Sequence, residues 1–388
     1  MSAPVAPARR RDAPLSERWL CWRNRVFASP GFQRWAAAFP LTRSRAGREA
    51  RALFDLCAGF VYSQILSACV RLDLFERLRR GPRDVVSLAL ELGLTPESAR
   101  RLFRAATSLR LLEALPDDRF ALGVLGAAML GNPSIADFVR HHELLYDDLR
   151  DPVALLRGET TSALSRFWPY ATNRPGASEA PSNDEEAARA FARYSDLMSR
   201  SQALIAQDVL DAYPARRHRC WLDVGGGEGA FIAAAAVRVT RLTFQLFDLP
   251  LVAARARVKL AALGLGTRVT VFDGDFLNDS LPRGADIISL VRVLHDHDDE
   301  SARAVLARIY AALPQGGTLL IAEPMAETPG GEPIGDAYFG FYLLALGRGR
   351  ARPPREILSL LRSAGFVDGQ ILKTRRPMLA SAVVAMRP

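Results

Sequence analysis

The stretch L-D-V-G-G-G-E-G, residues 222 to 229, separates a short apolar run from an alanine-rich segment. The apolar run, Cys220 to Val224, predicts a buried strand, and the segment Phe231 to Val237 predicts a helix. Glycines between a strand and a helix permit a sharp turn and a close approach of the backbone to a ligand. In α/β proteins such a turn lies at the carboxyl edge of the sheet, where ligands bind. The stretch therefore predicts an α/β domain with a binding site beside its first strand.

Apolar runs and helical segments alternate along the rest of the C-terminal half, which is typical of a mainly parallel sheet. The further strands are expected at Thr243 to Phe247, Val269 to Phe272, Ile287 to Leu294 and Thr318 to Ala322. Two more strands are expected between Gly365 and Met386, after a helix from Arg355 to Ser363. The predicted fold of residues 216 to 388 is therefore a Rossmann-like α/β sheet.

Acidic residues stand at the ends of the first three predicted strands. Asp223 belongs to the first strand, Asp248 ends the second in F-D-L-P, and Asp275 follows the third in G-D-F. A carboxylate at the second strand end could bind a ribose diol, and Asp275 with Phe276 could bind the amino group and the face of an adenine ring. The glycine spacing is tighter than the G-x-G-x-x-G of dinucleotide sites. We therefore predict S-adenosylmethionine, which carries adenine, ribose and a short charged tail, as the cofactor.

A dense cluster of His, Asp and Glu, V-R-V-L-H-D-H-D-D-E at 291 to 300, ends the fourth predicted strand. His295 would lie at the same sheet edge as the glycine turn, where it could serve as a catalytic base. The acids at 298 to 300 favour the start of the next helix, Ser301 to Leu313, as cap and dipole partners. The cluster could instead hold zinc or magnesium, or His295 could be a buried structural residue. The base is the favoured interpretation, and no metal is expected.

These motifs, taken in order, resemble those of the class I S-adenosylmethionine-dependent O-methyltransferases of the hydroxyindole and plant phenolic type. The motifs are D-V-G-G-G-E-G (223 to 229), F-D-L-P (247 to 250), G-D-F (274 to 276), V-L-H-D-H-D-D-E (293 to 300) and A-E-P (322 to 324). Two N-terminal segments, F-Q-R-W-A-A-A-F-P-L-T-R (32 to 43) and A-L-F-D-L-C-A-G-F-V-Y-S-Q (52 to 64), are most similar to the members that methylate hydroxycarotenoids in purple photosynthetic bacteria. The resemblance implies methyl transfer to the terminal tertiary hydroxyl of an acyclic carotenoid. A phenol or an aromatic polyketide is the alternative acceptor.

The same resemblance implies roles for individual residues. His295 would be the catalytic base, with the Glu323 carboxylate near it. The cofactor would be held by Asp223, Gly225, Gly227, Gly229, Asp248, Leu249, Asp275, Phe276 and Arg292, and the acceptor by Phe191, Tyr194, Met198, Tyr342 and Leu343. The sequence departs from the family at two positions: Ala351 replaces a second acid that flanks the histidine, and Val291 replaces a lysine four residues before it.

The N-terminal half predicts a second domain. Residues 51 to 130 favour a winged-helix module, with Thr95 capping a helix that starts at Pro96 and a hairpin over Leu115 to Leu122. The resemblance implies that this domain, expected to be all-helical apart from its wing, forms a homodimer. Residues 131 to 215 would then supply connecting helices and a substrate wall. Four arginines on the second helix of the module leave a winged-helix transcription regulator as an alternative: Arg100, Arg101, Arg104 and Arg110. No nucleic-acid partner is expected.

A basic arm occupies residues 1 to 50, since residues 1 to 51 hold eleven Arg against three acids. Leu15, Trp19, Trp22 and Val26 recur at helical spacing and predict an amphipathic helix. Such a helix could lie on an anionic membrane surface or pack on its own protein or a dimer partner, and both alternatives stay open. No apolar stretch is expected to cross a membrane, and the four cysteines lack CxxC spacing. We predict a cytoplasmic enzyme, with peripheral contact at the inner face of the photosynthetic membrane as an open alternative.

Overall fold

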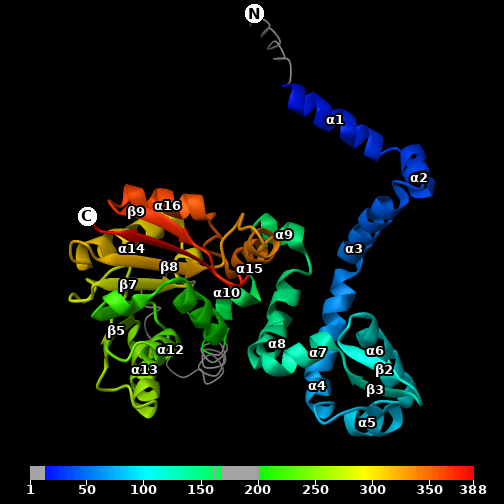
Figure 1. Ribbon diagram of the computed structural model, residues 1–388, viewed down its shortest axis with the longest axis horizontal. Helices are drawn as coiled ribbons and strands as arrows, with labels where there is room; N and C mark the ends of the chain where they lie inside the picture. Colours follow the sequence, from blue (N-terminus) through cyan, green and yellow to red (C-terminus); the bar gives the residue numbers. More distant parts are fainter. Residues whose placement is uncertain (1–13, 161, 168–198, 200) are drawn as a thin grey trace, which may run out of the picture. The chain divides into compact units, whose positions relative to one another are not determined.

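The computed structural model describes residues 14–160, 162–167, 199 and 201–388. The chain divides into two compact units, Met1–Ala128 and Met129–Pro388 (Figure 1).

The described part of the second unit is built on a seven-stranded sheet with strand order β6-β5-β4-β7-β8-β10-β9. Its strands are β4 (Cys220–Val224), β5 (Thr243–Asp248), β6 (Val269–Asp273), β7 (Ile287–Val291), β8 (Thr318–Glu323), β9 (Val367–Leu372) and β10 (Ser381–Met386). Strands β4 to β8 run parallel, whereas β10 is antiparallel to both of its neighbours. The Rossmann-like sheet and its two additional C-terminal strands are therefore confirmed.

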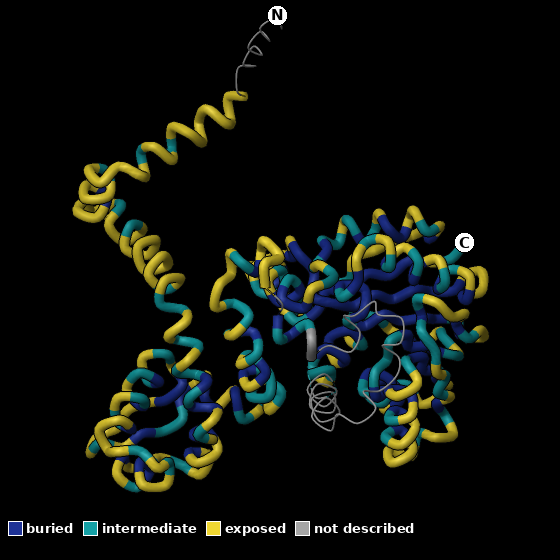
Figure 2. The backbone as a smooth tube through the Cα atoms, turned by 180° about the vertical axis from the view of Figure 1, so that it is seen from behind, coloured by how far each residue is buried: buried dark blue, intermediate teal, exposed yellow. Residues whose placement is uncertain are grey.

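Helices cover both faces of this sheet (Figure 1). They are α12 (Ala230–Arg238), α13 (Pro250–Ala262) and residues 201–212 on one face, and α14 (Asp299–Ala312) and α16 (Pro354–Ser363) on the other. Neighbouring residues of one strand face opposite layers, so that Trp221 packs with Phe231 while Leu222 belongs to the core under α14. The central strands β4, β7 and β8 and strand β10 are consequently among the most buried segments of the unit, whereas the edge strand β9 is exposed (Figure 2).

The order of the strands places a binding crevice between β4 and β7. After β4 the chain builds β5 and β6 on one side, and it then crosses to β7 and β8 on the other side. Two loops therefore leave adjacent parallel strands in opposite directions, and the gap between them at the carboxyl edge is where α/β proteins bind ligands. The glycine turn after β4 and the histidine-containing segment after β7 both lie at this gap.

The fourth strand is shorter than predicted, and His295 does not belong to it. Strand β7 ends at Val291 because Arg292 adopts a left-handed backbone conformation, with φ of 60°. A 3-10 turn, η2 (Leu294–Asp296), follows and carries His295. The next helix starts as expected, since the carboxylate of Asp298 accepts a hydrogen bond from the Ser301 backbone N–H at 2.8 Å.

The segment before the sheet contributes helices to the same unit. They are α8 (Pro133–Asp148), α9 (Pro152–Leu156) and α10 (Ala163–Phe167), and the short 3-10 turn η1 (Ala215–Arg217) lies just before β4. Two further helical elements follow β8, namely the π-helical turn η3 (Ile334–Tyr338) and α15 (Phe339–Leu346). Helix α8 is tied to α15 by the His141 ring, whose Nε2 lies 3.0 Å from the Tyr342 hydroxyl. The loop predicted at 173 to 182 lies outside the described residues.

The first unit combines helices with a small sheet of order β1-β3-β2. Its elements after the arm are α4 (Leu74–Arg77), β1 (Arg83–Asp84), α5 (Val85–Leu92), α6 (Pro96–Ser108), β2 (Leu112–Leu115), β3 (Arg119–Leu122) and α7 (Val124–Gly131), the last of which spans the boundary between the units. Thr95 caps α6 as predicted, accepting from the Ser98 backbone N–H at 3.2 Å. Beyond the expected hairpin, β1 pairs with β3, so the description as all-helical was wrong.

Three helices precede these elements: α1 (Leu15–Phe27), α2 (Pro30–Ala38) and α3 (Arg43–Arg71). No residue of α1 is buried in the chain, and large apolar side chains of α3, among them Phe54 and Phe60, are exposed. Helix α3 is long and apolar enough to cross a membrane by length and composition alone, contrary to the expectation that no stretch would be. Large apolar side chains of α1 and α3 are thus exposed on the described part of the first unit.

Candidate active site

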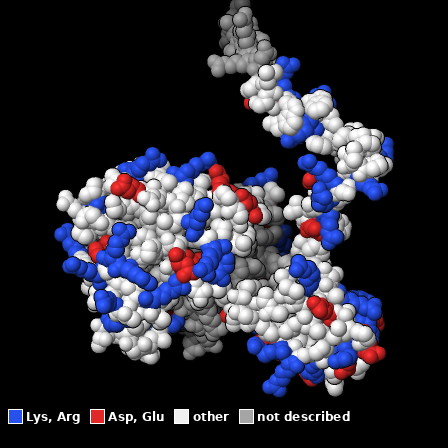
Figure 3. Space-filling model, in the orientation of Figure 1, with Lys and Arg blue, Asp and Glu red and all other residues white. Residues whose placement is uncertain are grey.

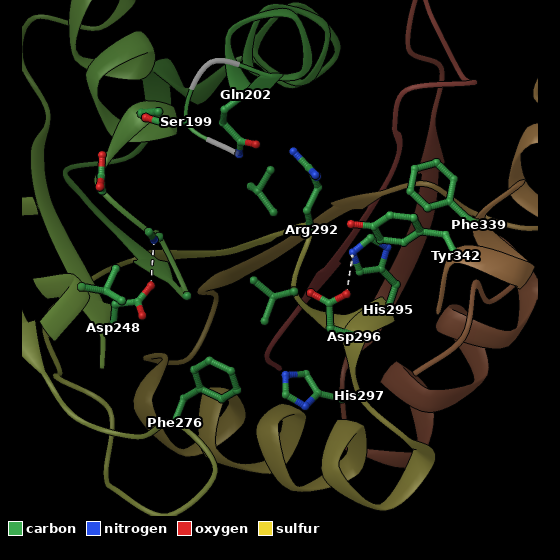
Figure 4. A pocket seen from close by; sticks show the side chains of 18 of the residues that line it. Ser199, Gln202, Asp248, Phe276, Arg292, His295, Asp296, His297, Phe339 and Tyr342 are labelled. Atoms are coloured by element: carbon green, nitrogen blue, oxygen red, sulfur yellow. Dashed lines mark hydrogen bonds and ion pairs between the residues drawn. The ribbon is translucent and has the colours of Figure 1, made fainter. Parts of the chain in front are cut away.

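A cavity opens at the crevice between β4 and β7 (Figure 4). Its described lining comprises Phe138, Ser199, Gln202, Gly225, Gly226, Gly227, Glu228, Ala230, Asp248, Val252, Phe276, Val291, Arg292, Val293, His295, Asp296, His297, Phe339 and Tyr342. Asp248 and Phe276 lie toward one end, whereas His295, Asp296, Phe339 and Tyr342 gather at the other (Figure 4). The cavity therefore has two chemically different ends.

The glycine turn lines the cavity beside Asp248 and Phe276. Gly225 and Gly227 have φ of 68° and 58°, a left-handed conformation that side chains disfavour. A Cβ on Gly225 would lie 2.8 Å from a methyl carbon of Val293, so the turn and the loop after β7 touch only because the side chain is absent. The backbone of the turn can accordingly contact a ligand directly.

Asp248 fixes the turn and faces the cavity. Its Oδ2 accepts a hydrogen bond from the Gly227 backbone N–H at 2.7 Å, and its Oδ1 accepts one from the Leu249 N–H at 2.8 Å. The carboxylate is buried in the chain but lines the cavity. Phe276 lies at the same end, with the His297 ring edge-on to it at 5.4 Å between centroids. A carboxylate beside an aromatic face suits the ribose and adenine of a nucleoside.

Four of the residues predicted to hold the cofactor are not among the lining residues. Asp223 lies beneath the turn, where Ser289 Oγ donates to its carboxylate and burial raises its pKa to about 7. Gly229 is the N-cap residue of α12 and allows Leu260 to pack closely, and Leu249 contributes its backbone N–H to Asp248. Asp275 turns onto its own loop and accepts from the Leu277 N–H and the Asn278 side chain. These residues shape the site from outside the cavity.

Polar side chains also line the cavity near the glycine turn: Ser199, Gln202, Glu228 and Arg292. Arg292 lines it and donates to Ser201 Oγ at 2.8 Å. Ser199 accepts a hydrogen bond from Lys259 Nζ at 2.6 Å, and the same ammonium lies 2.9 Å from Glu228 Oε2. A charged amino-acid tail would meet both cationic and anionic groups here.

His295 lies on the turn η2 at the opposite end. Its Nε2 is 3.2 Å from Asp296 Oδ1, a neighbour that the sequence analysis did not single out. Burial lowers the pKa of His295 to about 3 and raises the pKa of Asp296 well above its usual value, so both side chains are favoured in their neutral forms. The imidazole is thus held neutral, and the same burial makes it a weaker base than a histidine in water.

Glu323, at the end of β8, contacts the backbone of His295. Its Oε2 accepts from the His295 backbone N–H at 3.0 Å, and burial raises the pKa of this carboxyl to about 7. Glu323 Oε1 and His295 Nδ1 are both buried and have no hydrogen-bond partner among the described residues. The glutamate therefore holds the histidine turn in place, although it does not itself line the cavity.

Aromatic side chains dominate this end of the cavity. Tyr342 and Phe339 of α15 line it with Phe138 of α8, and Leu343 belongs instead to the core between α8, α10 and α15. The predicted acceptor residues Phe191, Tyr194 and Met198 lie outside the described residues. Phe138, Gln202 and Asp296 were missed because nothing local in the sequence marks a residue that reaches the cavity only through the fold.

The first two acids after His297 bind the start of helix α14 and two arginines. Asp298 caps α14, and Asp299 accepts from Arg350 and Arg352. Within the described ranges, no group of three or more His, Cys, Asp and Glu side chains gathers in a way that could hold a metal ion.

Comparison with known families agrees with this geometry. Residues 146–367 match the O-methyltransferase domain, and residues 54–131 match the O-methyltransferase dimerisation domain. The chain belongs to the O-methyltransferase family. As a member of this family it is an enzyme whose methyl donor is S-adenosylmethionine, and its dimerisation domain supports a homodimer.

Relatives of this O-methyltransferase cover nearly its whole length. Demethylspheroidene O-methyltransferase of Cereibacter sphaeroides is 43% identical over 94% of this chain and 94% of its own. The protein of the same name from Rhodobacter capsulatus is 36% identical over 99% of this chain and 94% of its own. Among solved structures, mitomycin 7-O-methyltransferase MmcR superimposes with a TM-score of 0.70 at 25% identity, covering 89% of this chain and 99% of that one.

Proposed function

We propose that this enzyme methylates the terminal tertiary hydroxyl of an acyclic carotenoid of the demethylspheroidene or hydroxyneurosporene type, in the biosynthesis of spheroidene. The observation that carries the proposal is the 43% identity to a demethylspheroidene O-methyltransferase over 94% of both chains. The aromatic end of the cavity supports it, because Phe138, Phe339 and Tyr342 offer ring surfaces to an apolar acceptor.

The lining residues suggest how the two substrates are divided between the ends. Asp248 and Phe276 would bind the ribose and adenine, the turn at Gly225 and Gly227 would contact the tail, and Arg292 would meet its carboxylate. When bound, S-adenosylmethionine supplies a methyl group on a positively charged sulfur. Asp223, Gly229, Leu249 and Asp275 would act indirectly, by shaping the turn and the strand ends.

His295 would act as the base for the acceptor hydroxyl. A tertiary alcohol is too weak an acid to be deprotonated beforehand by a neutral imidazole. As the oxygen bonds to the methyl carbon it becomes strongly acidic, and Nε2 can then take its proton. Nε2 can take that proton only in the tautomer that carries the ring proton on Nδ1, an atom with no hydrogen-bond partner among the described residues. Acceptor alignment and proton removal are thus the two tasks of this end of the cavity.

An acceptor assay tests the proposed function. Purified enzyme with labelled S-adenosylmethionine is expected to transfer the label to an acyclic 1-hydroxycarotenoid in detergent, giving a methyl ether detectable by mass spectrometry. Turnover of a simple phenol in the same assay is expected to be lower by at least about a hundredfold in kcat/KM, since it cannot fill an extended aromatic cavity. Efficient methylation of the phenol together with no carotenoid product would assign the enzyme to the alternative acceptor class.

The basic arm supports a second part of the proposal, which is peripheral contact with the photosynthetic membrane from the cytoplasmic side. Arg side chains are interspersed with uncharged surface along α1 to α3 (Figure 3). Trp19 and Trp22 of α1 are 56% and 60% exposed, and Glu17 is the only acid of that helix. Tryptophan and arginine on one exposed helix are typical of an anionic membrane interface, where the apolar carotenoid resides.

Vesicle flotation tests this contact. The double variant Trp19→Ala/Trp22→Ala is expected to bind anionic phospholipid vesicles at least about tenfold more weakly than the unmodified enzyme, because two large apolar surfaces are lost. The control is Val86→Ala/Leu90→Ala, which removes exposed apolar side chains from α5. Unchanged vesicle binding of the tryptophan variant, with a dimer that dissociates to monomers, would assign the arm to the subunit contact instead.

A further inference from the structure

Arg352 is a charged side chain with 0% of its surface exposed. Its Nη1 donates to the backbone carbonyl of Leu294 at 2.9 Å, and its Nη2 donates to the carbonyl of His297 at 2.8 Å. These two carbonyls bracket the turn that carries His295 and Asp296. The side chain of Asp299 accepts from Nη2 at 2.8 Å and from Nε at 3.1 Å, and so balances the buried charge.

The backbone next to Arg352 holds the same turn from one side. The Arg350 N–H donates to the carbonyl of His295 at 2.8 Å. Gly349 has φ of 74°, and a Cβ added to it would lie 2.1 Å from that carbonyl oxygen. The segment from Gly349 to Arg352 therefore lies directly against the backbone of the histidine and binds three of the carbonyls around it.

We propose that Arg352 is a positioning residue for methyl transfer: its guanidinium fixes the turn η2 and thereby sets where the imidazole of His295 stands in the cavity. The inference rests on the proposed role of His295. Arg352 is not among the lining residues, so it acts through the turn and not by contact with either substrate.

The fixed fork of the guanidinium explains why arginine is required here. Two carbonyls on either side of the turn and one carboxylate must be reached at once from a single planar group, which the ammonium of lysine cannot do. Position 351, between Arg350 and Arg352, is an alanine and offers no carboxylate. In this chain the neighbouring Arg352 and the Arg350 backbone, and not a carboxylate at 351, hold the histidine turn.

The substitution Arg352→Lys tests the proposal, with Arg268→Lys as the matched control. Arg268 also donates to three backbone carbonyls, those of Ala236, Val239 and Leu242, but it does not line the cavity and it contacts no residue of η2. We expect Arg352→Lys to lower kcat about ten- to a hundredfold, the scale of a misplaced reacting group, while the Kd of S-adenosylhomocysteine stays unchanged. Arg268→Lys is expected to keep the unmodified kcat, whatever its effect on the melting temperature.

A second readout follows His295 without any acceptor. In NMR titrations of isotope-labelled histidine, with the His295 signal assigned from His295→Gln, the pKa of His295 is expected to rise toward about 6.5 in Arg352→Lys as the loosened turn admits water. If Arg352→Lys does not fold, Gly349→Ala disturbs the same turn at the carbonyl of His295, and the same split between kcat and Kd is expected.

An unmodified kcat and an unchanged His295 titration in Arg352→Lys would overturn the proposal, as would an equal loss of kcat in Arg268→Lys. Failure of the proposed function would look different, because the unmodified enzyme would then fail to methylate the hydroxycarotenoid while the His295 titration still responded to Arg352.

Discussion

Replacement of His295 by alanine is expected to lower kcat at least about a hundredfold, which is the usual contribution of a positioned general base. The Kd of S-adenosylhomocysteine should not change, because the nucleoside end of the cavity is built from the glycine turn, Asp248 and Phe276. Burial lowers the pKa of His295 to about 3, so the imidazole is neutral at the pH of the cell, and it is a weak base until methyl transfer makes the acceptor oxygen strongly acidic. Single-turnover kinetics with labelled methyl donor measure the loss directly.

The matched control for this variant is His218→Gln. His218 precedes β4 at the amino edge of the sheet, where its Nε2 lies 2.7 Å from the Tyr213 hydroxyl. We expect this variant to keep the unmodified kcat. A His295→Ala enzyme that retained a near-normal rate would remove the base assignment and leave Asp296 and Tyr342 as the candidate acid–base side chains at that end among the described residues.

Replacement of Asp248 by alanine is expected to weaken the binding of S-adenosylhomocysteine by about ten- to a thousandfold. The expected size follows from the energy of hydrogen bonds to a charged group, which contribute about 1.5–3 kcal/mol each, because every 1.4 kcal/mol changes Kd about tenfold. The loss has two causes. The carboxylate would bind the ribose diol, and it also holds the turn through the Gly227 N–H. Isothermal titration calorimetry on the folded variant measures the change.

Asp273→Ala is the control for the cofactor site. Asp273 ends the neighbouring strand β6, but its exposed carboxylate binds Arg257 on the surface and does not line the cavity. Its removal is expected to leave the Kd unchanged. If Asp248→Ala bound the ligand as tightly as Asp273→Ala, the ribose would have to lie elsewhere.

The sequence predicted the parts of the site whose positions depend on local signals. The strand Cys220–Val224, the glycine turn after it and Asp248 at the end of β5 could be placed because apolar runs and glycines mark where parallel strands end. The acids after His297 could be assigned to the start of α14 for a similar reason, since cap residues stand at fixed offsets from a helix.

The remaining parts depend on backbone geometry and on contacts between distant segments. No sequence signal shows that Arg292 takes a left-handed conformation, and this single residue ends β7 early and moves His295 onto a turn. Asp275 is predicted to bind the adenine amino group, and the structure adds that its carboxylate accepts hydrogen bonds from backbone and side-chain donors of its own loop. Arg352 lies more than fifty residues after the turn that it binds, so only the fold reveals the contact.

The structure of a complex with S-adenosylhomocysteine and the unmethylated hydroxycarotenoid tests the central claim most directly. We predict that the thioether sulfur lies between the turn at Gly225 and the imidazole of His295, with the acceptor oxygen within about 2.6–3.2 Å of Nε2. The claim would be contradicted by a nucleoside bound away from Asp248, or by an acceptor hydroxyl placed out of reach of His295.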